Sequence, residues 1–252
     1  MLAIERRNAI MERLSRDGKV IVSILSKEFD VTEETIRRDI EKLEREGLAT
    51  KTYGGAVSNQ APSTELPYNI RKKVNVDEKQ YIADIVASMI NDGDRIMLDA
   101  SSTSIYVTRK IKQTKKNITV ITNSVEILLE LADKPGWTVL STGGLLKEGT
   151  FSLFGTSAEK MIRDHHVDIA ICSSKGMDPK MGITDSNEKD SEMKRAIFNA
   201  ADKRILVLDN SKFDKISFVR VCDYSDVDII VTDKNPGETW KKRFQDNNVR
   251  LE

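Results

Sequence analysis

Residues 31–57, VTEETIRRDIEKLEREGLATKTYGGAV, hold the clearest structural pattern in this chain of 252 residues. The pattern begins at Thr32, a residue type whose hydroxyl often accepts a hydrogen bond from a free N–H of a helix's first turn. Apolar residues then recur at helical spacing until a glycine ends the run, at Ile36, Ile40, Leu43 and Gly47. The sequence therefore predicts a helix over about residues 33–46 with one buried face and one exposed face.

Two more helices are predicted before this one, and a β-hairpin is predicted after it. Residues 4–16 and 22–29 each carry apolar side chains on a helical stripe. Residues 48–51 and 56–57 flank the pair Gly54-Gly55, and paired glycines tolerate the positive φ of tight hairpin turns. This order of elements is the layout of a winged helix-turn-helix, whose last helix lies in the major groove of DNA.

The exposed face of the predicted third helix carries side chains that suit DNA. Arginine can donate two hydrogen bonds to guanine or to a phosphate, and a backbone without Cβ can approach a phosphate closely. The candidate contacts are Thr35, Arg37, Arg38 and Lys42 on the helix, and Lys51, Thr52, Tyr53, Gly54 and Gly55 in the wing. Periodicity alone is equally consistent with solvated arginines that pair with Glu33, Glu34 or Glu41.

Composition narrows the class of protein. Forty basic and forty acidic residues give a formal net charge of zero, and residues 1–57 carry eleven of each, so DNA binding must come from local charge placement. The two cysteines, Cys172 and Cys222, have no paired spacing, which fits a reducing compartment. The sequence has no apolar run near the ~18 residues of a membrane helix, and its first residues are charged where a signal peptide would be apolar. We expect a cytoplasmic protein with no membrane partner.

The rest of the chain has a different pattern, in which short β-branched runs alternate with helical stretches. Strands are expected at 95–100, 118–122, 137–141, 167–172, 204–208 and 227–231, and helices at 78–90, 124–131, 156–163 and 190–201 with another that ends near 111. This alternation predicts an α/β domain with a mostly parallel sheet covered on both faces. We expect a DNA-binding domain at 1–57, a linker at 58–76 and the α/β domain at 77–252.

Four predicted strand ends carry hydroxyl, amide and glycine residues. They are Asp99-Ala100-Ser101-Ser102-Thr103-Ser104, Asn123-Ser124, Thr142-Gly143-Gly144 and Ser173-Ser174-Lys175-Gly176. Taken singly, each is explained more simply as a helix cap or a tight bend. Ligands of open parallel sheets bind outside the carboxyl ends of the strands, so four such ends together favour a polyol or phosphate site. Dinucleotide and P-loop motifs do not occur in the sequence, and the two adjacent histidines give little support to metal or triad chemistry.

Both parts of the chain contain motifs of a known family. VIVSILSKEFDVTEETIRRDIEKLEREGLATKTYGGAV, residues 20–57, resembles the N-terminal signature of the DeoR family of bacterial transcriptional repressors, in which a TIRRDL-type recognition helix precedes a Gly-Gly wing. LDASSTS, VITNS, STGG, GITDSNEKDSEMKRA and LVLDNSKF are similar to the family's later blocks. Ile40 and Tyr53 stand where the family usually has leucine and often has histidine, and Ser101 replaces the commoner glycine of the first loop.

The resemblance implies a ribose-5-phosphate isomerase-like fold for the larger domain and a phosphorylated sugar as its effector. It implies a ligand loop of Asp99, Ser101, Ser102 and Thr103, flanking contacts from Asn123 and Gly144, and charged members Lys175, Glu192, Lys194 and Lys212. No cofactor is implied. Ser101 places a Cβ where a phosphate would approach.

These observations predict a DNA-binding transcriptional regulator rather than an enzyme. We expect it to repress a sugar-utilisation operon, with double-stranded operator DNA and a phosphorylated sugar as partners. A homo-oligomer is expected because helix-turn-helix proteins commonly bind paired half-sites. An activator with the same parts is an alternative. A phosphosugar isomerase-like enzyme is another, because Asp99, Glu192, Lys175 and Lys194 could perform acid-base chemistry, although the attached DNA-binding module counts against it.

Overall fold

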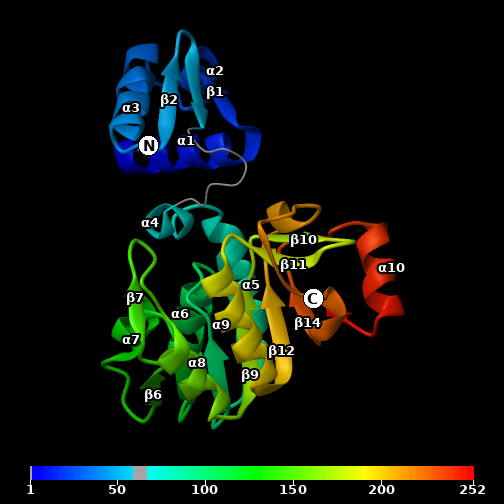
Figure 1. Ribbon diagram of the computed structural model, residues 1–252. Helices are drawn as coiled ribbons and strands as arrows, with labels where there is room; N and C mark the ends of the chain where they lie inside the picture. Colours follow the sequence, from blue (N-terminus) through cyan, green and yellow to red (C-terminus); the bar gives the residue numbers. More distant parts are fainter. Residues whose placement is uncertain (1, 59–66) are drawn as a thin grey trace. The chain divides into compact units, whose positions relative to one another are not determined.

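The computed structural model of the chain describes residues 2–58 and 67–252. It divides into two compact units, Met1–Asn75 and Val76–Glu252, and the ribbon in Figure 1 shows the elements of each. The first unit is built from short helices and a small sheet, and the second from a large sheet with helices on both faces. None of the helices in the described ranges is both long and apolar enough to cross a membrane.

The first unit contains the three predicted helices and the predicted hairpin. Its elements are α1 (Ala3–Asp17), β1 (Lys19–Ile21), α2 (Val22–Glu28), α3 (Glu33–Arg45), β2 (Ala49–Thr52), β3 (Gly55–Ser58) and α4 (Tyr68–Arg71). Thr32 caps α3 as predicted, since its Oγ1 accepts a hydrogen bond from the Thr35 amide. The inward face of α3 is buried at Ile36, Ile40 and Leu43, and these side chains pack with Ile10, Leu14 and Leu25 of α1 and α2.

The wing differs from the expectation in one respect. Gly54 and Gly55 are not among the residues with positive φ, so the glycine pair is not explained by that conformation. The unpredicted strand β1 gives the reason for Gly55. It pairs with β3 in a sheet of order β1-β3-β2, and a Cβ on Gly55 would lie 1.9 Å from the carbonyl oxygen of Val20. Gly55 is therefore required by the close approach of two strands.

The structure describes part of the predicted linker, 58–76. Residues 59–66 lie outside the described residues. Residues 67–75, which follow, contain α4 and cluster with the first unit, while Val76 already begins α5 (Val76–Met89) of the second.

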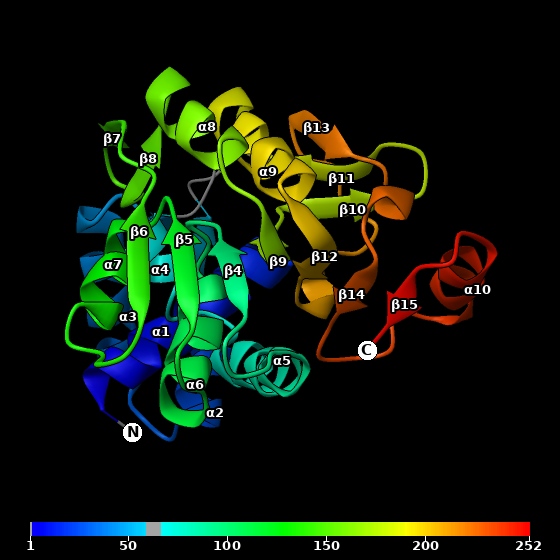
Figure 2. The ribbon, with the colours of Figure 1, turned by 90° about the horizontal axis from the view of Figure 1, so that it is seen from below.

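The second unit is organised by a seven-stranded sheet in which every neighbouring pair is parallel, which confirms the predicted fold class. Figure 2 shows the strands side by side in the order β15-β14-β12-β9-β4-β5-β6. The strands are β4 (Arg95–Leu98), β5 (Thr119–Thr122), β6 (Thr138–Ser141), β9 (Val167–Ser173), β12 (Ala201–Val207), β14 (Ile229–Val231) and β15 (Arg250–Leu251).

Helices cover both faces of this sheet (Figure 2). One core joins the sheet to α5, α6 (Ser104–Thr114) and α7 (Val125–Leu131). The other joins it to α8 (Thr156–Arg163), α9 (Glu188–Asn199) and α10 (Glu238–Asp246), where Trp240 and Phe244 pack with their rings 5.4 Å apart. The strands are apolar on both sides because both faces are buried, as expected for a parallel sheet.

Several short elements were not predicted. They are the hairpin of β7 (Leu145–Lys147) and β8 (Ser152–Phe154), a small antiparallel sheet of β10 (Gly176–Asp178), β11 (Gly182–Asp185) and β13 (Val219–Cys222), and two 3-10 helices at Asn210–Lys212 and Tyr224–Asp226. The last helix, α10, and the edge strand β15 were not predicted either. The order of the large sheet reverses between β4 and β9, because β4, β5 and β6 run outward in one direction and β9, β12 and β14 in the other. The carboxyl ends of β4 and β9 therefore meet at a topological switch point, where ligands of such sheets bind.

Candidate DNA-binding face and effector site

The predicted DNA contacts of α3 lie on the exposed side of that helix. Arg37, Arg38 and Lys42 are exposed, whereas Thr35 is half-buried and its hydroxyl is 2.9 Å from that of Thr32. In the wing, Lys51, Thr52, Tyr53 and Gly54 are exposed, and Tyr53 projects fully into solvent. Gly55 is buried beside β1, so we interpret it as a residue that lets the strands of the wing pack closely.

Three of these cations are held by acidic residues of the same unit. Arg37 Nη2 lies 2.6 Å from Glu33 Oε2, and Arg38 Nε lies 3.3 Å from Glu34 Oε1, each one helical turn away. Lys51 Nζ, in the wing, lies 2.5 Å from Glu41 Oε1 on α3, and its hydrogen bond lowers the pKa of Glu41 below the ordinary value. The pairing with Glu33 and Glu34 that the periodicity allowed is thus present. Contact of the exposed arginines with DNA stays a prediction.

Asp39, between these outward residues, faces the opposite way and was missed by the sequence reasoning. It is buried, and its carboxylate lies 2.5 Å from Nε of Arg6 and 3.5 Å from Nη1 of Arg7, both on α1. Its position on the apolar stripe, between Ile36 and Ile40, indicates in the sequence that its side chain points inward. This ion pair joins the first helix to the proposed recognition helix.

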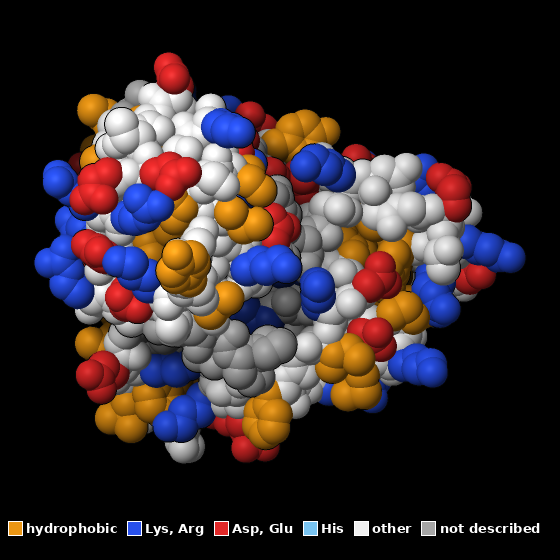
Figure 3. Space-filling model, turned by 90° about the horizontal axis from the view of Figure 1, so that it is seen from above, with side chains coloured by type: hydrophobic (Ala, Val, Ile, Leu, Met, Phe, Trp, Pro, Cys, Tyr) orange, Lys and Arg blue, Asp and Glu red, His pale blue; other side chains and the backbone are white. Residues whose placement is uncertain are grey.

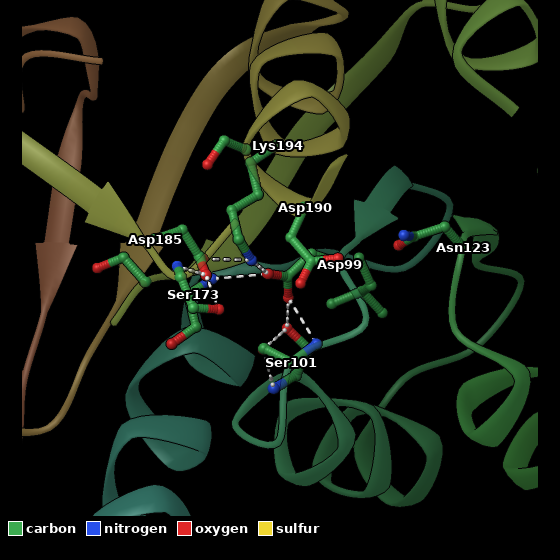
Figure 4. Close-up of polar contacts among 12 residues, drawn as sticks. Asp99, Ser101, Asn123, Ser173, Asp185, Asp190 and Lys194 are labelled. Carbon is green, nitrogen blue, oxygen red and sulfur yellow. Dashed lines mark hydrogen bonds and ion pairs between the residues drawn. The ribbon is translucent and has the colours of Figure 1, made fainter. Parts of the chain in front are cut away.

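The second candidate site lies at the carboxyl ends of the parallel strands, where Asp99 is the central residue (Figure 4). Its Oδ1 accepts hydrogen bonds from the Ser101 amide (3.2 Å) and the Ser104 hydroxyl (2.6 Å). Its Oδ2 accepts from the Ser173 amide (3.1 Å) and from Nζ of Lys194 (2.5 Å). Since each oxygen already accepts two hydrogen bonds, the carboxylate is filled by donors of the protein. Asp99 therefore positions the loop after β4 against the end of β9.

Lys194 lies between two buried carboxylates. Its Nζ contacts Asp99 and is 3.5 Å from Oδ2 of Asp185, at the end of β11. Burial alone would raise the pKa of Asp99, but the Lys194 ammonium and the hydrogen bonds from Lys194, Ser104 and Ser101 hold that pKa below its ordinary value. Burial alone would lower the pKa of Lys194, but Asp99 and Asp185 raise it. Asp99 and Lys194 are therefore both charged at neutral pH.

The loop between β4 and α6 is buried but leaves polar groups available. Ser101 Oγ accepts a hydrogen bond from the Ser104 amide and donates one to the Ser104 hydroxyl, so the side chain that replaces the family's glycine serves to cap α6. In the described ranges, no group accepts a hydrogen bond from the backbone amides of Ser102 and Thr103, and Thr103 makes no side-chain capping bond. Free amides at the start of an eleven-residue helix are suited to an anion.

The two predicted flanking contacts of the effector site, Asn123 and Gly144, have different surroundings. Asn123, after β5, is buried, and its Nδ2 donates to the carbonyl of Leu153 while its Oδ1 has no hydrogen-bond partner among the described groups. Figure 4 shows Asn123 apart from the contacts around Asp99. Gly144 has a φ of 99°, and a Cβ there would lie 2.5 Å from the carbonyl oxygen of Phe154. Gly144 thus allows the β7–β8 hairpin to pack.

The other predicted effector-site residues, Lys175, Glu192 and Lys212, form no hydrogen bond or ion pair with Asp99 in the described part of the chain. Lys175 is half-buried, and its amide donates to the carbonyl of Thr184 on β11. Glu192 is exposed, two residues before the buried Lys194, and lines a shallow hollow with Arg163 and Arg195. Lys212 is half-buried beyond β12, where its charge helps to offset the burial of Asp209 and lowers the pKa of that carboxyl.

The structure adds residues that were not predicted individually. Ser104, Ser173 and Asp185 each bind or approach the Asp99–Lys194 pair. Asp185 lies within GITDSNEKDSEMKRA, a block that resembles the family, and this position was the signal that the sequence offered for it. It is buried at the end of β11. The described residues contain no group of three His, Cys, Asp or Glu side chains arranged to hold a metal ion.

Two family models match the chain. Residues 6–61 match the DeoR-like helix-turn-helix domain, and residues 74–234 match the DeoR C terminal sensor domain. Among solved structures, a D-ribose-5-phosphate isomerase in complex with phospho-erythronic acid matches with a TM-score of 0.42 and 16% identity, over 55% of this chain and 54% of that one.

Curated relatives match nearly the whole chain. The HTH-type transcriptional regulator YulB of Bacillus subtilis is 38% identical over 100% of this chain and 96% of its own length. The HTH-type transcriptional repressor GlcR of Bacillus subtilis is 31% identical over 98% and 95%, and the L-fucose operon activator of Haemophilus influenzae is 30% identical over 97% of each chain. These are regulators and not enzymes. The chain belongs to the DeoR family of helix-turn-helix transcriptional regulators, with a DNA-binding domain followed by a DeoR-type sensor domain.

Proposed function

We propose that this regulator represses a sugar-utilisation operon, and that a phosphorylated sugar bound at the carboxyl edge of the large sheet controls its affinity for operator DNA. The observation that carries the effector proposal is the pair of free amides at Ser102 and Thr103, at the N-terminus of α6 and within a buried loop. A phosphate accepts hydrogen bonds from such amides and is favoured by the helix dipole.

The surrounding charges support a role for Asp99 and Lys194 in positioning this loop. They neutralise one another, so the loop amides and the hydroxyls of Ser102 and Thr103 are the groups left for the phosphate. Asn123 has a buried acceptor, Oδ1, that a sugar hydroxyl could satisfy. Lys175, Lys212, Glu192 and Gly144 remain candidates of lower rank, because the structure does not bring them to Asp99.

The DNA-binding proposal rests on the exposed face of α3 and the tip of the wing. Thr35, Arg37, Arg38 and Lys42 would contact the major groove, and Lys51, Tyr53 and Gly54 the backbone beside it. We assign this role to a domain at about 1–57 and the sensor role to about 77–252. We also propose a cytoplasmic homo-oligomer, since a dimer would engage two half-sites and gain affinity from both.

The test is a fluorescence-anisotropy titration of the full chain against the DNA upstream of its own gene, at one fixed salt concentration. The titration is repeated with a panel of sugar phosphates and with the same sugars unphosphorylated. Tight binding that one phosphorylated sugar relieves is the expected result. Binding that a sugar phosphate strengthens would instead favour the activator alternative, and the Haemophilus influenzae relative is named as an operon activator. Binding no tighter than to unrelated DNA would overturn the proposal.

Two conservative variants test whether the effector binds at the loop before α6. Ser102→Ala and Thr103→Val each remove one hydroxyl, and each should weaken the response to the sugar phosphate about tenfold, since a hydrogen bond to a charged group contributes roughly 1.5–3 kcal/mol. Thr108→Val is the matched control, because Thr108 is buried on the same helix and its hydroxyl bonds to the carbonyl of Ser104. An equal loss in all three variants would contradict the site.

A further inference from the structure

We propose that Glu33, Glu34 and Glu41 are specificity-determining residues, which restrain the affinity of this protein for DNA of arbitrary sequence. The inference rests on the proposed DNA-binding role of α3 and the wing. It assigns a function to three acids that do not themselves belong to the set of predicted DNA contacts.

Each acid holds one predicted contact. Glu33 pairs with Arg37 and Glu34 with Arg38 along α3, and Glu41 reaches across to Lys51 in the wing. Lys42 offers a contrast within the same helix, because no ion pair joins it to any residue that the structure describes. Three of the four cations proposed to meet DNA are therefore already bound to carboxylates in the free protein.

The charge balance of the helix points in the same direction. Residues 33–45 contain five acids and four bases, and one of the acids, Asp39, is buried against α1. On the face of the molecule drawn in Figure 3, Lys and Arg side chains are interspersed with Asp and Glu. Binding to DNA of arbitrary sequence comes almost entirely from unneutralised positive charge. A recognition face with neutralised arginines should bind such DNA weakly.

The same acids weaken the operator complex less than they weaken binding to DNA of arbitrary sequence. On any DNA, an arginine that turns to a phosphate leaves a carboxylate close to the phosphates, and like charges repel. The correct base sequence adds short-range bidentate hydrogen bonds to guanine, which arbitrary sequences do not supply. An acid one turn away also holds its guanidinium in a defined orientation. The acids therefore increase the ratio of operator affinity to non-specific affinity.

A purely structural role makes the opposite prediction. Glu33 and Glu34 lie in the first turn of α3, where negative charge stabilises a helix. If that were their whole contribution, neutral replacements would loosen the recognition helix and weaken binding to every DNA. If the acids restrain binding, the same replacements strengthen binding to arbitrary DNA.

The test uses the full chain with Glu33→Gln, Glu34→Gln, Glu41→Gln and the triple variant. Glu46→Gln is the matched control, because Glu46 is exposed at the end of α3 and its replacement changes the net charge equally. One probe is a labelled duplex of mixed sequence, and the other is a duplex selected by the wild-type chain from a random library. Both are titrated over a series of KCl concentrations.

We expect each single variant to bind the mixed duplex about threefold more tightly than Glu46→Gln does, and the triple variant about tenfold, with a steeper dependence on salt. Affinity for the selected duplex should rise less, so that the specificity ratio falls. Variants that bind the mixed duplex no tighter than Glu46→Gln, or more weakly, would overturn the inference. Failure of the wild-type chain to select any sequence would instead overturn the proposed function on which the inference rests.

A second measurement uses the cations themselves. Arg38→Ala leaves Glu34 without its partner, whereas Lys42→Ala leaves no acid behind. The loss of affinity for the mixed duplex should therefore be larger for Arg38→Ala, and the double variant Glu34→Gln with Arg38→Ala should recover part of it. No gain in affinity from Glu34→Gln in the Arg38→Ala background would count against the restraint.

Discussion

The ammonium group of Lys194 on α9 lies 2.5 Å from Oδ2 of Asp99 at the end of β4, and both side chains are buried. The two residues are 95 positions apart in the sequence. Asp99 also accepts a hydrogen bond from the amide of Ser173, which ends β9. The contact thus ties α9 and the loop before α6 to the point at which the strand order of the sheet reverses.

Lys194→Met tests the energetic role of this contact. The substitution leaves Asp99 and Asp185 buried without their cation, and loss of one partner of a buried pair typically costs roughly 3–5 kcal/mol. We expect the free energy of unfolding of the second unit to fall by about 3 kcal/mol. Urea unfolding followed by tryptophan fluorescence measures this unit alone, because both tryptophans, Trp137 and Trp240, lie within it.

The control is Lys242→Met, which makes the same change at an exposed position of α10. It should alter stability by less than about 0.5 kcal/mol. A second variant, Asp99→Asn combined with Lys194→Met, removes one of the stranded charges and should recover part of the loss. Equal stability of Lys194→Met and the wild-type chain would show that water or a shifted proton compensates the buried carboxylates.

Asp168 provides a prediction about pH. Arg95 Nη2 lies 2.7 Å from its Oδ1, and the hydrogen bonds from Arg95 lower the pKa of Asp168 from 3.8 to about 2. A carboxyl whose pKa is depressed by folding stabilises the folded state above its unfolded pKa, and the contribution is lost as the pH falls toward the folded value. Because the pair is partly exposed, its contribution should be only about 1 kcal/mol.

The measurement compares the wild-type chain with Asp168→Asn by urea unfolding at several pH values. The wild-type chain should be more stable by this amount near neutrality, and the difference should shrink below about pH 4. Asp246→Asn, at an exposed position of α10, should show no such trend. A difference that grows as the pH falls would contradict the assignment of the shift to Arg95.

The sequence predicted the elements well where periodicity is long, and poorly where elements are short. α3, α9 and the longer parallel strands β9 and β12 have enough residues to show their pattern, whereas β7, β8 and β10 have three residues each and β15 has two. The nine-residue helix α10 was also missed, because only Trp240 and Phe244 in it are apolar. The strand ends with polar residues and Lys194 were among the predicted site residues, but the pairing of Lys194 with Asp99 was not predicted. Contacts between residues so distant in the chain depend on strand order, which no local pattern contains. Arg37 and Arg38 could be placed outward, and their pairing with nearby acids was one of two interpretations. The actual pairs, and the partners of the inward Asp39, required the structure.

Gly144 gives a prediction about packing of the β7–β8 hairpin. Gly144 and Gly149 both have positive φ, but only at Gly144 would a Cβ meet other atoms. Gly149→Ala should therefore cost about 1 kcal/mol from its backbone conformation alone. Gly144→Ala should cost a further 1–3 kcal/mol or so, because Phe154 or Ala158 must shift. Urea unfolding of both variants measures the difference, and equal costs would show that the hairpin moves freely.

Asp39 gives the last prediction, which concerns the first unit. Its carboxylate holds Arg6, which is itself buried, so Asp39→Ala leaves a buried guanidinium without a partner. We expect a loss of about 3 kcal/mol confined to this unit. Hydrogen exchange followed by mass spectrometry should show faster exchange in α1 and α3, while the tryptophan-monitored unfolding of the second unit stays unchanged.

Glu46→Ala is the control, since it removes an exposed acid at the end of the same helix. Its exchange should match that of the wild-type chain. DNA binding should fall in Asp39→Ala even though Asp39 faces away from the proposed contacts, because α3 would lose its attachment to α1. If exchange in α1 and α3 stayed at the wild-type rate while DNA binding fell, Asp39 would have to act at the DNA itself. The inward orientation of its carboxylate argues against that role.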